Sequence, residues 1–422
     1  MDPAHVIRLG TAPFRLAGLM RRQWWDEARL KQLQWVRLKR LLRHAYRHSD
    51  FYRARLDAAG LHPDSITSLA EFRRVPFLRR EDLREPHHLI DRRFDPAVLP
   101  HATTSGSTGR RTTVYFDRPG HFLAKVLLKA RARLTCGVRP WHRIALFQEE
   151  PYAGRSAERG QVRSFSIHAP VEDLLGAVTP FAPDVLYGFP GHLALLGEAA
   201  AGRLRPRLVF TSGELLETGL RQRLTVAFAA PVLDVYGCTE VKEIAFECPA
   251  RAGYHLNADW LHLEAVGPDD PSGAAPGTLL VTSLYNYGMP LLRYALGDSG
   301  ELLDHPCPCG RGLPLVRPTS GRLVDYFVLA GGQRVAPYSM TCAIELVPGM
   351  RQYQIVQTHR NRVVVRVVPL PHFDASAARA ALGERLAPVL PGVAVTVEQV
   401  DRLLPEHSGK YRIVRSEVAA AG

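Results

Sequence analysis

The stretch Thr103-Thr-Ser-Gly-Ser-Thr-Gly109 marks the point at which the character of this 422-residue chain changes. Two glycines three residues apart, flanked by hydroxyl side chains, can turn backbone N–H groups inward around an oxyanion. The spacing is not that of a Walker loop, and no lysine lies nearby. The stretch therefore predicts a phosphate-binding loop, with an ordinary solvated loop as the alternative.

Downstream of this loop, apolar runs of buried-strand length alternate with helical patterns such as that of Gly120 to Leu134. The runs are Thr113-Val-Tyr-Phe116, Arg143-Ile-Ala-Leu-Phe147, Val185-Leu-Tyr187, Arg207-Leu-Val-Phe210 and Val232-Leu-Asp-Val-Tyr236. Most of them are followed by a glycine-containing turn and a helical pattern. This alternation predicts a layered α/β fold whose functional loops lie at the carboxyl ends of the strands.

The flanking regions have other patterns. Between residues 21 and 60, apolar residues recur every three or four positions with arginine and lysine between them, which predicts a basic helix that packs its apolar face on its own domain. From residue 326 onward, the order strand, strand, helix, strand predicts a small α+β domain of about 95 residues. We therefore expect a large α/β domain over residues 1–322, with a mainly helical lead-in over 1–100, and a small mobile α+β domain over 326–422.

The composition is that of a soluble globular protein with a net charge of +13, from 54 Lys+Arg against 41 Asp+Glu. Only six residues are lysine, so the charge is almost all arginine and is spread along the chain. This pattern favours a compositional bias over a nucleic-acid partner. No apolar run of transmembrane length or secretory type occurs, so we expect no membrane insertion and a cytoplasmic location.

Six separated motifs, in this order, resemble those of the adenylate-forming (AMP-forming) ligases, specifically the phenylacetate–coenzyme A ligase and coenzyme F390 synthetase-like branch. They are Thr104-Ser-Gly-Ser-Thr-Gly109, Thr211-Ser-Gly-Glu-Leu215, Tyr236-Gly-Cys-Thr-Glu240, Arg293-Tyr-Ala-Leu-Gly-Asp298, Gly321-Arg-Leu-Val-Asp325 and Ser408-Gly-Lys410. The resemblance implies activation of a carboxylic acid by ATP as an acyl-adenylate, release of pyrophosphate, and transfer to coenzyme A.

The resemblance also implies roles for individual residues. The phosphates of ATP would be held by the loop formed by Thr104, Ser105, Gly106, Ser107, Thr108 and Gly109. Adenine would be flanked by Ser212, Gly213, Glu214, Tyr236 and Gly237. Asp298 would accept the ribose hydroxyls and Arg322 would reach ribose or phosphate.

The chemistry requires cations and hydrogen-bond donors where negative charge accumulates, on the attacking carboxylate and the α-phosphate. The resemblance implies that Glu240 binds Mg²⁺, Thr239 contacts the α-phosphate and Lys410 bridges the phosphate and the attacking carboxylate. Asp325 matches the hinge about which the small domain would turn between the two half-reactions.

A second group of residues suggests a metal. Cys307-Pro-Cys309 presents two thiols in a rigid turn, and Cys248 with His255 can complete the Cys₃His set of a structural zinc site. A buried or redox-active cysteine pair is the alternative. A subset of the resembled branch carries cysteines here and is expected to bind zinc.

The acid and the acceptor are less defined. Tyr187 and Phe189 are candidates for an aromatic wall of the acyl pocket. Lys242, a further candidate for the substrate pocket, lies with Glu243 just past the magnesium glutamate, and the two suggest a polar acceptor in place of a plain aryl acid. The acceptor is coenzyme A or, alternatively, an amine, a carrier-protein thiol or a hydroxyl group. A further alternative is a basic nucleic-acid-binding or regulatory protein on a degenerate ligase fold, although we expect no nucleic-acid partner. A homodimer is left open.

Overall fold

The structure is a computed structural model in which residues 3–103, 112–148, 161–216, 218–267, 277–320, 327–335, 340–341, 343–344, 347–371, 373–403 and 413–418 are described. These residues form two compact units, one within 3–139 and 235–320, the other within 140–234 and 327–418. Helices and large sheets occur together, so the predicted α/β class is confirmed. The predicted domain boundary near Asp325 stays a prediction, because residues 321–326 lie outside the described part of the chain.

The first unit opens with helices: α1 (Pro3–Arg22), α2 (Glu27–His48), α3 (Asp50–Ala58) and α4 (Leu69–Phe72), then single 3₁₀ turns at Arg80–Leu83, Pro86–Leu89 and Pro96–Val98. The helix predicted over residues 21–60 is interrupted, between residues 22 and 27 and again at Ser49. Asp26 accepts a hydrogen bond from the backbone N–H of Arg29, and Ser49 from that of Tyr52. These side chains cap α2 and α3, and a cap requires non-helical backbone.

The remainder of the first unit is mainly antiparallel sheet. A hairpin of β1 (His101–Thr103) and β2 (Thr113–Tyr115) leads into α5 (Arg118–Phe122), a π-helical turn (Leu123–Leu127) and α6 (Leu128–Thr135). The larger sheet has the order β10 (Leu261–Ala265), β11 (Thr278–Ser283), β12 (Tyr294–Leu303), β13 (Leu315–Ser320), β9 (Tyr254–Leu256), β8 (Lys242–Glu247), β7 (Val232–Cys238). A single apolar core joins the helices to this sheet, as the apolar face of α2 predicted.

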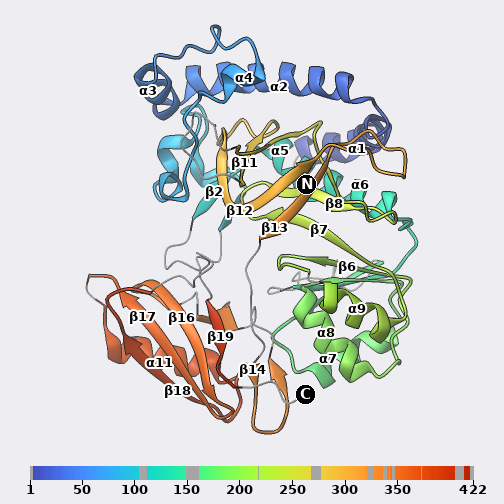
Figure 1. Ribbon diagram of the computed structural model, residues 1–422, viewed down its shortest axis with the longest axis vertical. Helices are drawn as coiled ribbons and strands as arrows, with labels where there is room; N and C mark the ends of the chain where they lie inside the picture. The colour runs from blue at the N-terminus through green and yellow to red at the C-terminus, as the bar shows by residue number, and fades with distance from the viewer. Residues whose placement is uncertain are drawn as a thin grey trace. The chain divides into compact units, whose positions relative to one another are not determined.

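The second unit contains the predicted parallel strands. Their order is β6 (Leu208–Ser212), β5 (Val185–Gly188), β3 (Ile144–Gln148), β4 (Val162–Ser166), and each neighbouring pair is parallel. Helices α7 (Val171–Phe181), α8 (Pro190–Ala200) and α9 (Thr218–Phe228) pack next to one another in this region (Figure 1). Their apolar side chains and those of the strands share one core.

The C-terminal residues form a separate sheet and core (Figure 1). After the short strands β14 (Phe327–Val328) and β15 (Arg334–Val335) come β16 (Met350–His359), β17 (Arg362–Pro369), α11 (Ala375–Leu386), β18 (Ala394–Gln399) and β19 (Val414–Ser416). The sheet order is β18-β17-β16-β19, and α11 buries Ala378, Leu382 and Leu386. The predicted order of strand, strand, helix and strand is present here. Among the described residues, no helix is long and apolar enough to cross a membrane.

Candidate functional site

Two of the predicted nucleotide residues meet in the first unit. The phenol Oη of Tyr236, at the end of β7, donates a hydrogen bond of 2.9 Å to Oδ2 of Asp298 on β12. Burial and the carboxylate of Asp298 raise the pKa of Tyr236, so the phenol stays a proton donor. The contact joins motifs 62 residues apart. Both side chains are only partly buried, so a ligand can reach them.

The predicted magnesium ligand lies in the turn between β7 and β8. Glu240 is 8% exposed, and its Oε1 accepts a hydrogen bond of 2.9 Å from Oη of Tyr294. Because this hydrogen bond holds Oε1, the orientation of the second carboxylate oxygen, Oε2, is fixed as well. Thr239 is half-buried in the same turn. A carboxylate oxygen is the ligand type that Mg²⁺ prefers, so the residues fit the ion.

The β7–β8 hairpin requires glycine at position 237. Its β-carbon, if present, would lie 2.3 Å from the carbonyl oxygen of Lys242, so a larger residue would force the strands apart. Cys238 pairs with Lys242 across a three-residue loop, and Lys242 has φ of +60°. Loops of this length place one residue in the left-handed region, usually glycine, and a lysine there is strained by about 1 kcal/mol. Gly237 therefore has a structural role, and Lys242 occupies a strained position.

Lys242 lies in an environment that disfavours its charge. Burial, followed by the neighbouring cations Lys129 and Lys125, lowers its pKa to about 8, although Cys238 and Glu240 act in the opposite direction. Its Nζ lies 5.4 Å from the ring centroid of Phe116. Three of the six lysines of the chain thus act on one small region. An anionic group placed there would relieve their mutual repulsion.

In the second unit, the Ser212-Gly213-Glu214 turn follows β6. Gly213 has φ of +89°, and a β-carbon would lie 2.6 Å from the ring of Phe189, so both conformation and contact require glycine. Oε2 of Glu214 accepts a hydrogen bond of 3.0 Å from the N–H of Gly191 in the first turn of α8. Its Oε1 is buried and has no hydrogen-bond partner among the described residues. This oxygen can accept a hydrogen bond from a ligand.

The two candidate pocket aromatics belong to the same region. Phe189 precedes α8 and covers Gly213, whereas the ring of Tyr187 on β5 lies 6.0 Å from that of Phe210 on β6. Both side chains are half-buried. These contacts are those of packed aromatics, and the predicted role in the acyl pocket stays a prediction.

The four predicted zinc ligands are brought together. One ligand atom of each of Cys248, His255, Cys307 and Cys309 lies within 4.8 Å of the others. The Sγ atoms of Cys248 and Cys307 are 3.6 Å apart, and Sγ of Cys309 is 3.3 Å from Nε2 of His255. A tetrahedral zinc site with Zn–S bonds of 2.3 Å places neighbouring sulfurs about 3.7 Å apart. The donor set and its spacing therefore fit zinc.

Hairpins of the sheet assemble this cluster. Cys248 follows β8, His255 lies on β9, and the Cys307–Cys309 turn connects β12 to β13, which pairs with β9. Nδ1–H of His255 donates to the carbonyl oxygen of Leu313 at 3.4 Å. This bond fixes the ring tautomer and leaves the lone pair of Nε2 toward the cysteines. Burial lowers the pKa of His255 to about 4, so the ring is neutral.

Several predicted residues lie outside the described part of the chain. They are Thr104, Ser105, Gly106, Ser107, Thr108, Gly109, Arg322, Asp325 and Lys410. Their roles stay predictions. Sequence analysis in turn missed Tyr294, which holds Glu240, and Leu313, which orients His255. Tyr294 stands inside the motif Arg293–Asp298, so the motif contained the signal.

Arg293 of the same motif is structural. Its guanidinium is fully buried, with Nε donating to Glu264 at 3.0 Å and Nη1 to the carbonyl oxygen of Val75 at 2.7 Å. The residue itself has φ of +50°. It therefore ties β12 to the helical lead-in, and β12 carries Asp298.

No family model matches the sequence. Among characterised proteins, the chain is 29% identical over 352 residues to the phenylacetate–coenzyme A ligase of Thermus thermophilus, which covers 78% of each chain. It is 28% identical over 329 residues to the phenylacetate–coenzyme A ligase of Escherichia coli, covering 72% of this chain and 73% of that one.

Among solved structures, the chain resembles 2-hydroxyisobutyryl-CoA ligase. In the thioesterification state of that protein the TM-score is 0.65 at 24% identity, covering 94% of this chain and 92% of the other. In its postadenylation state the TM-score is 0.63, again at 24% identity, covering 94% of this chain and 91% of the other. At this identity the likeness establishes the fold.

Proposed function

We propose that this chain, which is similar to phenylacetate–coenzyme A ligases over more than 70% of its length, is an adenylate-forming ligase that activates a carboxylic acid with ATP and transfers the acyl group to coenzyme A. The observation that carries the proposal is the hydrogen bond between Tyr236 and Asp298. It joins the residue expected beside adenine to the residue expected on the ribose, from motifs far apart in sequence.

Different residues have different roles in the first half-reaction. The carboxylate of the acid attacks the α-phosphorus, a P–O bond forms, and pyrophosphate leaves with the electrons of the bond that breaks. Lys410 stabilises the charge that develops on the phosphate and the attacking oxygen, and Thr239 donates to the α-phosphate. Glu240, held by Tyr294, would bind a magnesium ion, which would supply positive charge to the departing phosphates. The unpaired Oε1 of Glu214 supports a contact with the amino group of adenine.

Lys242 indicates the class of acid. A half-buried lysine in a strained conformation, close to Lys125 and Lys129, favours a substrate with a second anionic or strongly polar group. Lys129 already pairs with Glu243 at 3.6 Å, so the argument rests on Lys242, for which a plain aryl acid offers no charged partner.

The acceptor separates the leading proposal from its alternatives. Coenzyme A gives a thioester, whereas an amine, a carrier-protein thiol or a hydroxyl gives an amide, an acylated carrier or an adenylated alcohol. Incubation with the acid and ATP, with and without each acceptor, followed by mass analysis of products distinguishes these outcomes. Absence of pyrophosphate release with every acid, together with salt-sensitive binding of nucleic acid, would favour the regulatory alternative.

The proposal is tested by a pyrophosphate-release screen over aryl, arylacetic, fatty and amino-acid-like carboxylates, repeated with Lys410→Ala. We expect the substitution to lower adenylate formation by about 10² or more. Lys31→Ala is the matched control, because Lys31 is an exposed lysine paired with Glu27 on α2. Equal rates for Lys410→Ala and Lys31→Ala would show that Lys410 does not have this role.

A further inference from the structure

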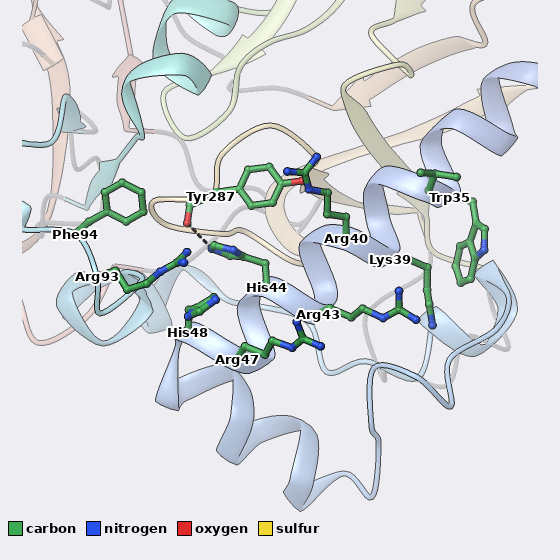
Figure 2. Close-up of a pocket in the computed structure, with 11 residues that line it drawn as sticks. Trp35, Lys39, Arg40, Arg43, His44, Arg47, His48, Arg93, Phe94 and Tyr287 are labelled. Carbon is green, nitrogen blue, oxygen red and sulfur yellow. Dashed lines mark hydrogen bonds between the residues drawn. The ribbon is translucent and has the colours of Figure 1, made fainter. Parts of the chain in front are cut away.

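A basic cavity of about 750 Å³ lies on the helical lead-in, apart from every residue assigned above (Figure 2). It is bounded by α2, by Arg93 and Phe94, and by the loop that carries Tyr287. Its lining consists of Trp35, Val36, Lys39, Arg40, Arg43, His44, Arg47, His48, Arg93, Phe94 and Tyr287. The lining thus contains five lysine or arginine side chains and no acidic one.

Basic residues that recur along α2 form one wall of this cavity. Lys39, Arg40, Arg43 and Arg47 recur at spacings of three and four, so they project from one side of the helix. The opposite side is fixed in the core by residues that include Leu38, Leu41, Leu42 and Ala45. From Trp35 to Arg47 this wall is about 18 Å long. The basic residues are thus held on a rigid helix.

Most of the cations of the cavity are not neutralised. Arg43 pairs with Asp64 at 2.7 Å, and Arg93 pairs with Asp91 at 2.7 Å. Lys39 donates to the carbonyl oxygen of Pro63, which carries no net charge. Arg40 and Arg47 have no acidic partner among the described residues. A surplus of about three positive charges remains, and burial lowers the pKa of Lys39.

Aromatic faces complete the cavity. The guanidinium of Arg40 lies 5.6 Å from the ring centroid of Tyr287, and His44 meets the same ring edge-on at 4.9 Å. The backbone of the Tyr287 loop is held in place, because Oδ2 of Asp117 accepts hydrogen bonds from the N–H groups of Tyr287 and Gly288. Figure 2 shows Arg40 and His44 next to this ring. A planar group can stack here with phosphate oxygens at the arginines.

We propose that this cavity is a second ligand site, for a phosphorylated small molecule of nucleotide size with a planar base. The volume is that of a small-molecule site. The uncompensated charge matches one or two phosphate groups. Asp64 and Asp91, which pair with Arg43 and Arg93, would repel the phosphates of a longer nucleic-acid strand. The proposal does not depend on the adenylation activity, because none of the residues assigned to that reaction lines the cavity.

The test uses the full chain and adenosine 3′,5′-bisphosphate, with inorganic pyrophosphate and adenosine as partial probes, in titration calorimetry at fixed ionic strength. Arg40→Gln with Arg47→Gln removes the two unpaired arginines. Arg379→Gln with Arg385→Gln on exposed positions of α11 removes the same charge elsewhere and is the matched control. Lysine at positions 40 and 47 in a third variant keeps the charge but loses the planar fork.

We expect the glutamine variant to lose one binding event for the bisphosphate, by about tenfold or more in affinity, while the α11 control keeps it. The lysine variant should bind with intermediate affinity, and pyrophosphate release with the acid should be unchanged in all three. Equal binding by the glutamine variant and the control would overturn the proposal. So would a single-stranded oligonucleotide that binds more tightly than the bisphosphate through the same two arginines.

Discussion

At the scale of single residues, the surroundings of Glu214 disfavour the ionised form of its carboxyl group. Burial raises its pKa from 4.5 to about 7, and the hydrogen bond from Gly191 only partly offsets this effect. The folded chain therefore holds this proton more tightly than the unfolded chain does. Between about pH 4.5 and pH 7 the contribution of Glu214 to the free energy of unfolding falls as the pH rises.

Glu214→Gln should remove this dependence. We expect the variant and the wild type to melt at similar temperatures near pH 5, and the variant to melt higher at pH 8, because the wild type then carries a buried charge. Thermal unfolding at half-unit steps of pH measures the difference. Glu384→Gln, at an exposed position of α11, is the control and should give no such trend. His192 acts in the opposite direction in part of this window, because burial and His168 lower its pKa to about 4 and only the unfolded chain then binds the proton. This contribution is the same in the wild type and the variant, so it cancels in their difference. A constant offset between variant and wild type would contradict the assignment.

Lys242 combines a strained backbone conformation with the contact to the acid that we propose. Glycine accepts φ of +60° without steric cost, so Lys242→Gly should keep the fold and change the melting temperature by only a few degrees. The same substitution removes the cation. We therefore expect the ratio of kcat/KM for an arylacetic acid with a second carboxylate, relative to phenylacetate, to fall by about tenfold or more.

Lys242→Arg separates charge from strain in this experiment. It keeps the cation and the strained backbone, so it should retain most of the preference for the dianionic acid. If the glycine variant showed an unchanged ratio, Lys242 would not contact the acid, and the lysine would be a structural feature of the hairpin.

At the scale of elements, the cysteine cluster joins the sheet to the helical lead-in. Gly312 follows the Cys307–Cys309 turn, and a β-carbon there would overlap the backbone carbonyl of Trp25. Arg311 places its guanidinium 4.7 Å from the ring of Trp24 and donates to Gln23. A metal ion that fixes the turn would therefore also fix the corner between α1 and α2.

Purified protein should contain about one equivalent of zinc per chain, and chelation should lower the melting temperature by about 5 °C or more. Tryptophan fluorescence should change with chelation, because the turn contacts Trp24. Cys307→Ala should have both effects without a chelator. Cys136→Ala is the matched control, since Cys136 is a thiol outside the four that donates to the carbonyl oxygen of Glu247. Less than about half an equivalent of zinc with the four ligands intact would refute the site.

The elements also show what the sequence can and cannot predict. Strands β3, β5, β6 and β7 were located within two residues, because a strand buried on both faces is a continuous apolar run. The break before α2 was missed because a cap at Asp26 interrupts the helix without altering its apolar period. The metal cluster was predicted from its three cysteines and one histidine, from the rigid Cys307-Pro-Cys309 turn and from the resemblance.

The basic cavity was not predicted, because its walls come from residues about 250 positions apart in sequence. Its helix wall was recognised as a basic amphipathic pattern, and the packing of its apolar face was predicted correctly. Whether the other face met solvent or a cavity depended on Phe94 and Tyr287, whose positions no local pattern encodes. Similarly, the hydrogen bond from Tyr294 to Glu240 depends on the register of β12, which is a property of the sheet.

At the scale of the whole molecule, the proposed reaction needs two arrangements of the chain. In the proposed adenylation step, Lys410 must approach the phosphates. In the second step, the thiol of the acceptor must reach the acyl group, which is closed to it during adenylation. Asp325 is the position at which the resemblance places this change. Large changes of φ and ψ at few residues are what a hinge provides, and proline forbids them by fixing φ near −65°.

Asp325→Pro should therefore uncouple the half-reactions. We expect a single turnover of pyrophosphate release to keep most of its rate, while thioester formation from pre-formed adenylate falls by about tenfold or more. Rapid-quench measurement of both steps on one preparation gives the ratio. Asp325→Ala removes the carboxylate but leaves the backbone free, so it should keep the ratio near that of the wild type. A parallel loss of both steps in the proline variant, with an unchanged melting temperature, would mean that this residue supports the site in one fixed arrangement instead of acting as a hinge.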